Sequence, residues 1–441
     1  MRQDTRRRDD RAEPHVIQGL FRRAVGAAHR IVHPQYSEER ARLDEIERTI
    51  LHSAASQQQQ IDRLTRALEA VSARVETLAR DRHLRGLDRR VEGLRDASTR
   101  QYKALSQALK FASWDEELRI DERRLARRLE RLRKSTAPVL VGPWTGEVGF
   151  ELLYWIPFVT WVLRETGISR DRIVVVSRGG AEPWYAHLHG RYLDVLSCVD
   201  VGRFRAQTAE RKKQRTMGPF DREIVRLAIE RAGLGRPVLL HPGLMYRLFT
   251  PFWKQKATVR RIETYTSYQR LGASAIAALA GRLPSEYVAV RFYFSSCFPD
   301  TPANRAFVQA AVAGLAESTN VVLLNTGFRI DDHEDFGLAP PASVHTIDDL
   351  MTPARNLDVQ TAVIAGAKAF VGTYGGYSYL APLCGVPSLA FYSRREEFFA
   401  HHLELAERVF RSMNAGALVP LDVRDVGILR MALGPVATLR S

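Results

Sequence analysis

Two glycine-containing loops each follow a short apolar run and precede a helical pattern. The first is TGEVGFE at 145–151, after PVLVG, and the second is TYGGYS at 373–378, after AFVG. In an open α/β sheet, loops at the carboxyl ends of parallel strands face the ligand crevice, and glycines let a ligand approach the backbone closely. The second loop favours an anion, because the free N–H groups and the dipole of the following helix point the same way. We expect an anion there to contact a set of neighbouring residues, namely Gly372, Thr373, Tyr374, Gly375, Gly376 and Ser378.

The first loop carries two carboxylates, Glu147 and Glu151, either of which could face the crevice and act as a general base. The alternative is that both acids favour a helix N-terminus through its dipole. Gly146 and Gly149 would form the same side of the site. His241 ends the strand-like run PVLLH and is another candidate base, because imidazole titrates near neutral pH, although a packed histidine is the simpler interpretation.

An arginine, Arg291, ends the strand-like run YVAVR and would point into the same crevice, where its planar fork binds anions bidentately. An ordinary salt bridge is the alternative. Ser295 follows in the next loop. DDHED at 331–335 lacks the spacing of a metal site, so we read it as a solvated loop and expect no metal.

Strand-like runs alternate with amphipathic helical patterns from about residue 137 onward, which predicts parallel sheets covered on both faces. They fall into two series, at 138–142, 172–177 and 237–241, and at 287–291, 320–325, 343–347, 369–372 and 387–393. We therefore expect an α/β fold with two Rossmann-like, doubly wound domains, at 137–283 and 284–425, facing each other across a cleft.

The first third of the chain has a different pattern. Residues 38–134 contain almost no Gly or Pro and carry apolar residues at heptad spacing, which predicts a coiled coil that pairs either with a second copy of the chain or with itself. Residues 1–36 form a basic segment with an amphipathic helix at 16–32. That helix either lies on anionic lipid or packs on the protein.

Composition narrows the class of protein. The net charge is +15, but acids are interleaved with bases along the chain, so we expect no nucleic-acid binding. The three cysteines are far apart and suggest neither disulfides nor a zinc site. The sequence shows no signal peptide and no long apolar segment, so we expect a cytoplasmic protein.

The first loop resembles the N-terminal glycine loop of GT-B glycosyltransferases of the heptosyltransferase and fucosyltransferase-like groups, with Gly146, Gly149, Glu151 and Pro157 at matching positions. In the heptosyltransferase pattern an Asp follows the second glycine and serves as the base. Phe150 stands there in this chain, so the base stays open between Glu151 and Glu147.

The segment AGAKAFVGTYGGYSYLAPLCGVPSLAFYS at 365–393 is similar to the donor-binding segment of the same enzymes. Arg291 matches only part of their His-x-Arg-Arg pattern. The resemblance implies an inverting, metal-independent transferase that needs no cofactor and takes a nucleotide-sugar as co-substrate. A glycan or glycolipid acceptor made at the inner face of the membrane would suit the basic helix at 16–32. The second loop and Arg291 would then bind the diphosphate, while Asn325 and Thr326, at the end of another strand, either touch the nucleotide or form an ordinary turn.

Two other functions remain open from the sequence. One is a nucleotide-sugar epimerase or hydrolase, which would keep the phosphate site but need no acceptor. The other is a non-catalytic coiled-coil scaffold with a degenerate GT-B fold, consistent with the missing Asp and the reduced arginine pattern. The aromatic and basic run MYRLFTPFWKQ at 245–255 could contact an acceptor or pack between domains.

Overall fold

The computed structural model describes residues 59–60, 62–63, 65–70, 98–99, 119–209, 213–274, 276–327, 334–337 and 343–426. The chain divides into two compact units, Met1–Ala112 and Ser113–Ser441. The described residues of the first unit are helical. The amphipathic helix predicted at 16–32 and most of the heptad pattern lie outside the described residues, so the coiled coil stays a prediction.

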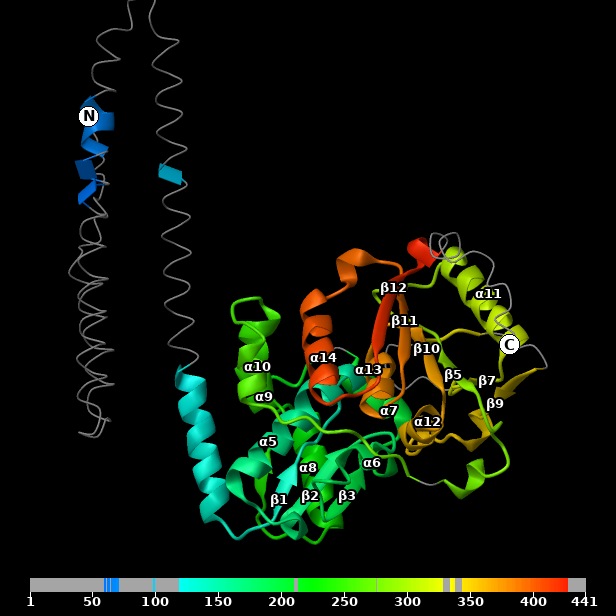
Figure 1. Cartoon of the computed structure of the whole chain (residues 1–441). Coiled ribbons are helices and arrows are strands. Elements are labelled where there is room, and N and C mark those ends of the chain that lie inside the picture. The colour runs from blue at the N-terminus through cyan, green and yellow to red at the C-terminus, as the bar shows by residue number, and fades with distance from the viewer. Residues whose placement is uncertain are drawn as a thin grey trace, which may run out of the picture. The chain divides into compact units, whose positions relative to one another are not determined.

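The first α/β domain is built on a parallel sheet with the strand order β3-β2-β1-β4 (Figure 1). Its strands are β1 (Val139–Val141), β2 (Ile173–Ser177), β3 (Arg191–Asp194) and β4 (Val238–Leu240). β1 and β2 are buried throughout, as expected for a sheet covered on both faces. The three predicted strands are confirmed. The sequence pattern missed β3 because this edge strand, RYLD, is short and largely polar.

The helices of this domain begin directly after the first glycine loop. The π-helical segment η2 (Glu151–Trp155) joins α4 (Val148–Phe150) to α5 (Ile156–Thr166). The remaining helices are α6 (Glu182–Tyr185), α7 (Val201–Thr208), α8 (Pro219–Arg231), α9 (Gly243–Trp253) and α10 (Arg260–Thr264). Apolar side chains of η2 and α5 are buried against the sheet because they recur at helical spacing.

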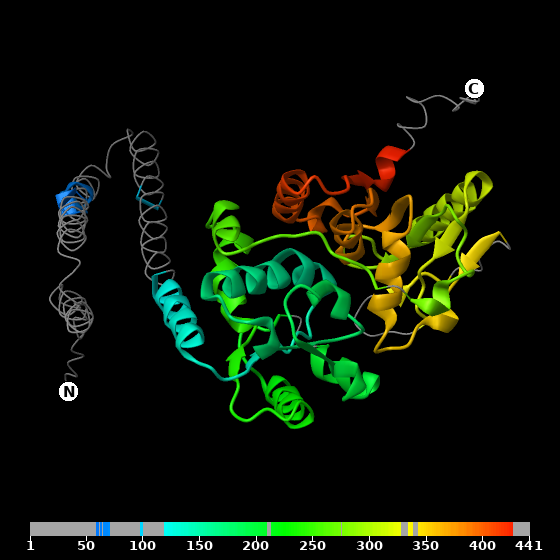
Figure 2. The same ribbon diagram turned by 60° about the horizontal axis from the view of Figure 1, so that its bottom comes forward.

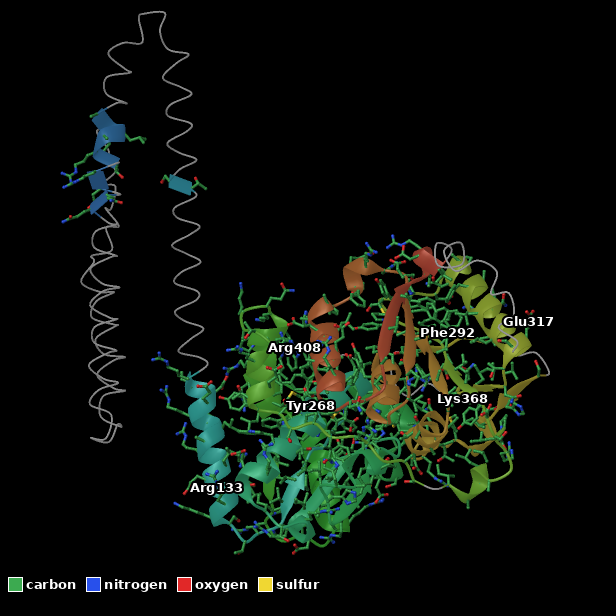
Figure 3. All side chains as sticks on the ribbon, in the orientation of Figure 1. Arg133, Tyr268, Phe292, Glu317, Lys368 and Arg408 are labelled. Atoms are coloured by element: carbon green, nitrogen blue, oxygen red, sulfur yellow. The ribbon has the colours of Figure 1, made fainter. Side chains whose placement is uncertain are left out.

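Residues 119–134 form a helix, at the end of the segment predicted to be a coiled coil, that packs on the first α/β domain (Figure 1). Leu125, Leu129 and Leu132 are buried in the core that includes β1. Glu122 pairs with Arg261 at 3.0 Å, and Arg133, labelled in Figure 3, donates to a backbone carbonyl of α5 at 2.8 Å. The apolar stripe here therefore serves the same chain.

The second α/β domain is built on a parallel sheet with the strand order β12-β11-β10-β5-β7-β9. Its strands are β5 (Val288–Arg291), β7 (Val321–Leu323), β9 (Val344–Thr346), β10 (Ala369–Thr373), β11 (Ser388–Tyr392) and β12 (Leu418–Asp422). A separate antiparallel pair joins β6 (Tyr293–Phe294) to β8 (Glu334–Asp335). All five strands predicted in this series are present, so the expected class of two parallel α/β sheets is confirmed.

In the described part of this domain, four helices cover the sheet: α11 (Pro302–Ser318), α12 (Asn356–Ala365), α13 (Gly376–Leu383) and α14 (Ala400–Ser412). Among them, α13 packs on β10 and β11, and α11 packs on β7. Phe292 is buried between the strands and these helices, whereas Glu317 and Lys368 lie at the surface (Figure 3).

The two α/β domains are in direct contact. The backbone N–H of Leu357, on α12, donates to the carbonyl of Gly179 after β2 at 2.7 Å, and Trp184 donates through Nε1 to Thr361 Oγ1 at 2.8 Å. Figure 2 shows the first domain in cyan and green beside the second in yellow to red. These contacts fix the carboxyl edges of the two sheets relative to each other.

The last helix, α14, returns to the first domain. Arg408 on α14, labelled in Figure 3, pairs with Glu263 on α10 at 3.6 Å. The imidazole Nδ1 of His402 lies 2.5 Å from the hydroxyl of Tyr154 in η2. Residues that are far apart in the sequence therefore complete one surface.

Candidate active site

A cavity of about 310 Å³ lies where the carboxyl ends of strands from both sheets meet. It is lined by the first glycine loop, by Arg178 directly after β2, by Arg291 at the end of β5, and by residues 374–377 after β10. This is the crevice position at which open α/β sheets bind ligands. The structure thus brings together the two loops and the arginine that the sequence predicted to share a site.

The two glycine loops touch, and the contact requires glycine. A Cβ on Gly376 would lie 2.7 Å from Cγ1 of Val148 and 2.8 Å from the backbone nitrogen of Gly149. Gly375 has a φ of +156°, and a Cβ there would lie 2.2 Å from the hydroxyl of Tyr293. The glycines therefore let the N-terminus of α13 meet the first loop without a side chain between them.

Arg291 is almost fully buried, and its orientation is fixed by three neighbours. Its Nε and one terminal nitrogen donate to Oδ1 of Asp335 at 3.2 and 3.1 Å, and the other terminal nitrogen donates to Gln360. Its guanidinium lies over the ring of Tyr377, 4.1 Å from the centroid. Arg291 both forms a salt bridge and lines the cavity, so the two interpretations offered by the sequence hold together.

Asp335, the last residue of the run DDHED, does not lie in the solvated loop that the sequence predicts. Residues 331–333 lie outside the described residues, but Glu334 and Asp335 form β8, and the Asp335 side chain is only 14% exposed. The second carboxylate oxygen of Asp335 accepts from the backbone N–H and the hydroxyl of Thr326 at 2.7 and 3.0 Å. Asp335 therefore positions the arginine. Among the described residues, no group of three or more His, Cys, Asp or Glu side chains is placed to hold a metal ion.

The structure separates the two candidate bases. Glu147 is half-buried and lines the cavity, whereas Glu151 is fully buried beneath the loop and does not line it. Burial lowers the pKa of Lys213, another lining residue, and the nearby charge of Glu147 opposes that shift. Glu147 is the carboxylate of the pair that a substrate in the cavity can reach.

Glu151 belongs to a buried network instead. Its Oε1 accepts from the Ser177 hydroxyl at 2.5 Å and from the Tyr185 hydroxyl at 2.6 Å, while Oε2 has no hydrogen-bond partner among the described residues. Burial raises the pKa of Glu151 to about 7, although the charge of Arg178 acts in the opposite direction. The network supports the first loop from below, because Arg178 donates to the carbonyl of Gly146.

Part of the second loop serves the fold and part serves the cavity. Tyr374, Gly375 and Gly376 line the cavity. Ser378 caps α13 by accepting from the Gly375 N–H at 3.1 Å, and the Thr373 hydroxyl bonds both backbone groups of the facing strand residue at 3.0 and 2.9 Å.

Gly372 lies beside the backbone of β5, where a Cβ would lie 2.0 Å from a carbonyl oxygen. It is therefore a packing residue, as are Thr373 and Ser378.

The other predicted residues also divide. Ser295 and Thr326 line the cavity, and Gly149 does so on the opposite side. Asn325 does not line it and donates to a backbone carbonyl at 2.9 Å. His241 does not line it either, since its Nδ1 accepts from a backbone N–H at 2.9 Å and its ring packs against Asp221.

The sequence interpretation missed two cations, Arg178 and Lys213, that line the cavity. Arg178 directly follows β2, so the strand-end reasoning that identified Arg291 applied to it equally. Lys213 carried no such signal, because it follows a polar stretch outside the regular elements.

Six of the aromatic side chains that line the cavity lie next to one another. We define this group as the aromatic wall, and its members are Phe150, Tyr154, Trp253, Phe399, His401 and His402. Its members come from the first loop, η2, α9 and the start of α14, and neighbouring rings lie 4.4–5.8 Å apart. Trp253 belongs to the run MYRLFTPFWKQ, but nothing in the sequence pointed to the residues from α14.

No protein-family model matches the chain, and no curated protein matches its sequence. Its fold is similar to that of E. coli ADP-heptose LPS heptosyltransferase II, at 13% identity and a TM-score of 0.36, over 58% of this chain and 85% of that one. The glycosyl transferase family 9 protein from Veillonella parvula matches at 12% identity and a TM-score of 0.37, over 69% of this chain and 91% of that one. A protein described as a UDP-N-acetylglucosamine 2-epimerase from Listeria monocytogenes matches at 12% identity and a TM-score of 0.31, over 69% of this chain and 98% of that one.

Two of these three proteins are glycosyltransferases, and one of those two is a heptosyltransferase. No helix in the described part of the chain combines the length and apolar composition that a membrane crossing needs.

Proposed function

We propose that the protein is a GT-B-type glycosyltransferase that moves a sugar from a nucleotide-sugar to a hydroxyl of a glycan, glycolipid or other cell-surface acceptor. The observation that carries the proposal is the composition of the cavity. One half-buried carboxylate, Glu147, lines the same cavity as a set of anion-binding groups that includes Arg291, Arg178 and the N-terminus of α13. A base within one cavity with a diphosphate site is what glycosyl transfer to a hydroxyl requires.

In this proposal the diphosphate of the donor lies against the N-terminal turn of α13, where the N–H groups of the first turn point outward and the helix dipole is positive. Arg291, held in place by Asp335, binds it from the second domain. Arg178 lies across the cavity, in the first domain. Charge develops on the diphosphate as the bond to the sugar breaks, so these fixed cations stabilise the transition state more than the bound donor.

Glu147 would accept the proton from the acceptor hydroxyl as its oxygen attacks the anomeric carbon. The bond from that carbon to the diphosphate breaks, and the nucleoside diphosphate leaves with the electron pair. A single displacement of this kind inverts the anomeric configuration. We propose a reaction without a metal or cofactor, in which Arg291, Arg178 and α13 provide the positive charge.

The experiment is a thermal-shift screen of the full chain against GDP, UDP, ADP, CMP and dTDP, because a ligand that binds only the folded state raises its stability by mass action. We expect one nucleoside diphosphate to raise the melting temperature saturably. Arg291→Lys keeps the charge but loses the planar fork, so it should weaken that shift. Arg226→Lys, on the outer surface of α8, is the matched control and should leave the shift unchanged.

The reaction is then tested with a nucleotide-sugar that carries the nucleoside diphosphate found in the screen. Release of nucleoside diphosphate that increases when an acceptor is added supports the transferase. Formation of an epimer or of free sugar without any acceptor would identify the epimerase or hydrolase instead. A folded protein that binds none of the five nucleotides would refute the proposal and favour a scaffold.

A further inference from the structure

The aromatic wall contains none of the groups assigned above to the diphosphate, which are Arg291, Arg178 and the N-terminal turn of α13. It does contain one of the two large apolar side chains that are strongly exposed within the described residues. Phe399 is 51% exposed, and the other, Val419 on β12, is 47% exposed and does not line the cavity. An exposed aromatic side chain in a concave site is a typical mark of a ligand contact.

The wall is continuous with the proposed base. Phe150 follows Gly149 in the first loop, three residues after Glu147, and its ring lies 5.1 Å from Trp253 and 5.4 Å from His402. Lys213, which is electrostatically coupled to Glu147, lies over the same ring at 5.0 Å from its centroid. A ligand stacked on the wall would therefore present its edge to the carboxylate.

Phe399 extends the wall outward. Its ring lies 5.8 Å from both His401 and His402, and those two imidazoles are 4.4 Å apart. The hydroxyl of Tyr154 bonds to His402 and fixes its ring. Burial lowers the pKa of His402 to about 3, so this imidazole is neutral at physiological pH and adds no charge to the wall.

Hydrogen-bonding groups share the cavity with the wall. They are the imidazole of His401, which belongs to the wall, and the charged side chains of Lys213 and Glu397. A lipid chain needs a surface that is apolar throughout, whereas a pyranose ring offers an apolar C–H face and a rim of hydroxyls. Alternating rings and polar groups complement the second kind of ligand.

We infer that the aromatic wall is an acceptor subsite that stacks a pyranose ring on Phe399 and the neighbouring rings, with one ring hydroxyl directed at Glu147. The acceptor is then a carbohydrate at the reacting end, whatever it is attached to. This inference rests on the proposed function for the role of Glu147, but the stacking site itself does not depend on it.

The test uses saturation-transfer NMR of the full chain with underivatised methyl pyranosides of hexoses, N-acetylhexosamines and hexuronic acids, and with 1-hexanol as an uncharged apolar probe. We expect at least one pyranoside to bind with its C–H face saturated. Phe399→Ala should weaken that binding roughly 3- to 10-fold, as expected for the loss of one stacked ring. Phe399→Trp, which keeps a ring, should retain it, and Val419→Ala is the matched control for loss of an exposed apolar side chain.

Binding of 1-hexanol alone, pyranoside binding that Phe399→Ala leaves unchanged, or no pyranoside binding in folded protein would each overturn the inference. The nucleoside diphosphate screen distinguishes this failure from failure of the proposed function. Phe399→Ala should leave the nucleotide shift intact, because Phe399 is not among the groups assigned to the diphosphate. If the wild-type protein binds a pyranoside but none of the five nucleotides, the proposed transferase function is refuted and the stacking site is not.

Discussion

Glu151→Gln should change how the stability of the first α/β domain depends on pH. Glu151 is fully buried, and its pKa rises from 4.5 to about 7 on folding because burial disfavours the charged form. Between these pH values the folded state binds more protons than the unfolded state, so the contribution of Glu151 to the free energy of unfolding falls as pH rises. It is fully present below pH 4.5 and is lost above about pH 7.

The size of the effect follows from the shift. Each pKa unit corresponds to about 1.4 kcal/mol, so the charged carboxylate costs about 3 kcal/mol relative to the protonated form. Glutamine keeps an oxygen that can accept from Ser177 and Tyr185, and it does not titrate. The wild-type protein should therefore lose about 3 kcal/mol relative to Glu151→Gln between pH 4.5 and pH 8.

Urea unfolding followed by tryptophan fluorescence reports mainly on the first α/β domain, because five of the six tryptophans lie within 137–283 and the second α/β domain contains none. Trp144, Trp155 and Trp184 are all buried in the first domain. The measurement compares wild-type protein with Glu151→Gln at several pH values between 4.5 and 8. Glu230→Gln, whose side chain is 71% exposed in the same domain, is the control and should show no such trend.

A difference between wild-type and Glu151→Gln that does not change with pH would refute the reasoning. A difference that grows in favour of the wild type as pH rises would mean that Glu151 is held charged by Arg178. In that case the carboxylate and the guanidinium act as an ion pair beneath the loop, and burial is not the dominant influence on the pKa.

Three further predictions concern the cavity. Glu147→Gln should lower the rate of transfer by roughly 10²- to 10⁴-fold, the usual loss for a general base, while the nucleotide-induced thermal shift stays unchanged; an unaffected rate would exclude Glu147 as the base. Gly376→Ala should destabilise the protein by about 1–3 kcal/mol in urea unfolding and weaken nucleotide binding, because its Cβ would collide with the first loop, whereas Gly314→Ala, which has open space on α11, should be neutral or stabilising. Asp335→Asn should cost about 3–5 kcal/mol, because it leaves the charge of Arg291 buried without its partner; a loss below about 1 kcal/mol would show that the pair is solvated.

The strand pattern predicted most of the fold because parallel strands buried on both faces are short, continuous apolar runs. β1, β2 and β10 have this form. β3 and β8 do not, since an edge strand and a two-residue pairing can be polar. The sequence also could not show that residues 119–134 pack on the first domain, because an apolar stripe at helical spacing fits any apolar partner.

The site was predictable to the extent that it depends on strand ends. Arg291 and the two glycine loops were found in this way, and Arg178 could have been. The sequence could not show which hydroxyls the protein uses itself. Thr373 and Ser378 have the chemistry of ligand contacts, but the structure shows both bonded to backbone groups. Asp335 was misread because its partner is 44 residues away in the sequence.

The return of α14 to the first domain has a consequence for synthesis on the ribosome. His402 follows its partner Tyr154 by 248 residues. The first domain ends near residue 283 and α14 begins at Ala400, so at 5–20 residues per second the first domain waits for roughly 6–23 s before α14 can cover it. During that interval Tyr154, Phe150 and Trp253 are exposed as an apolar surface on the nascent chain. The protein is therefore expected to be most prone to aggregation, and most in need of a chaperone, after its first domain has emerged and before its last helix is made.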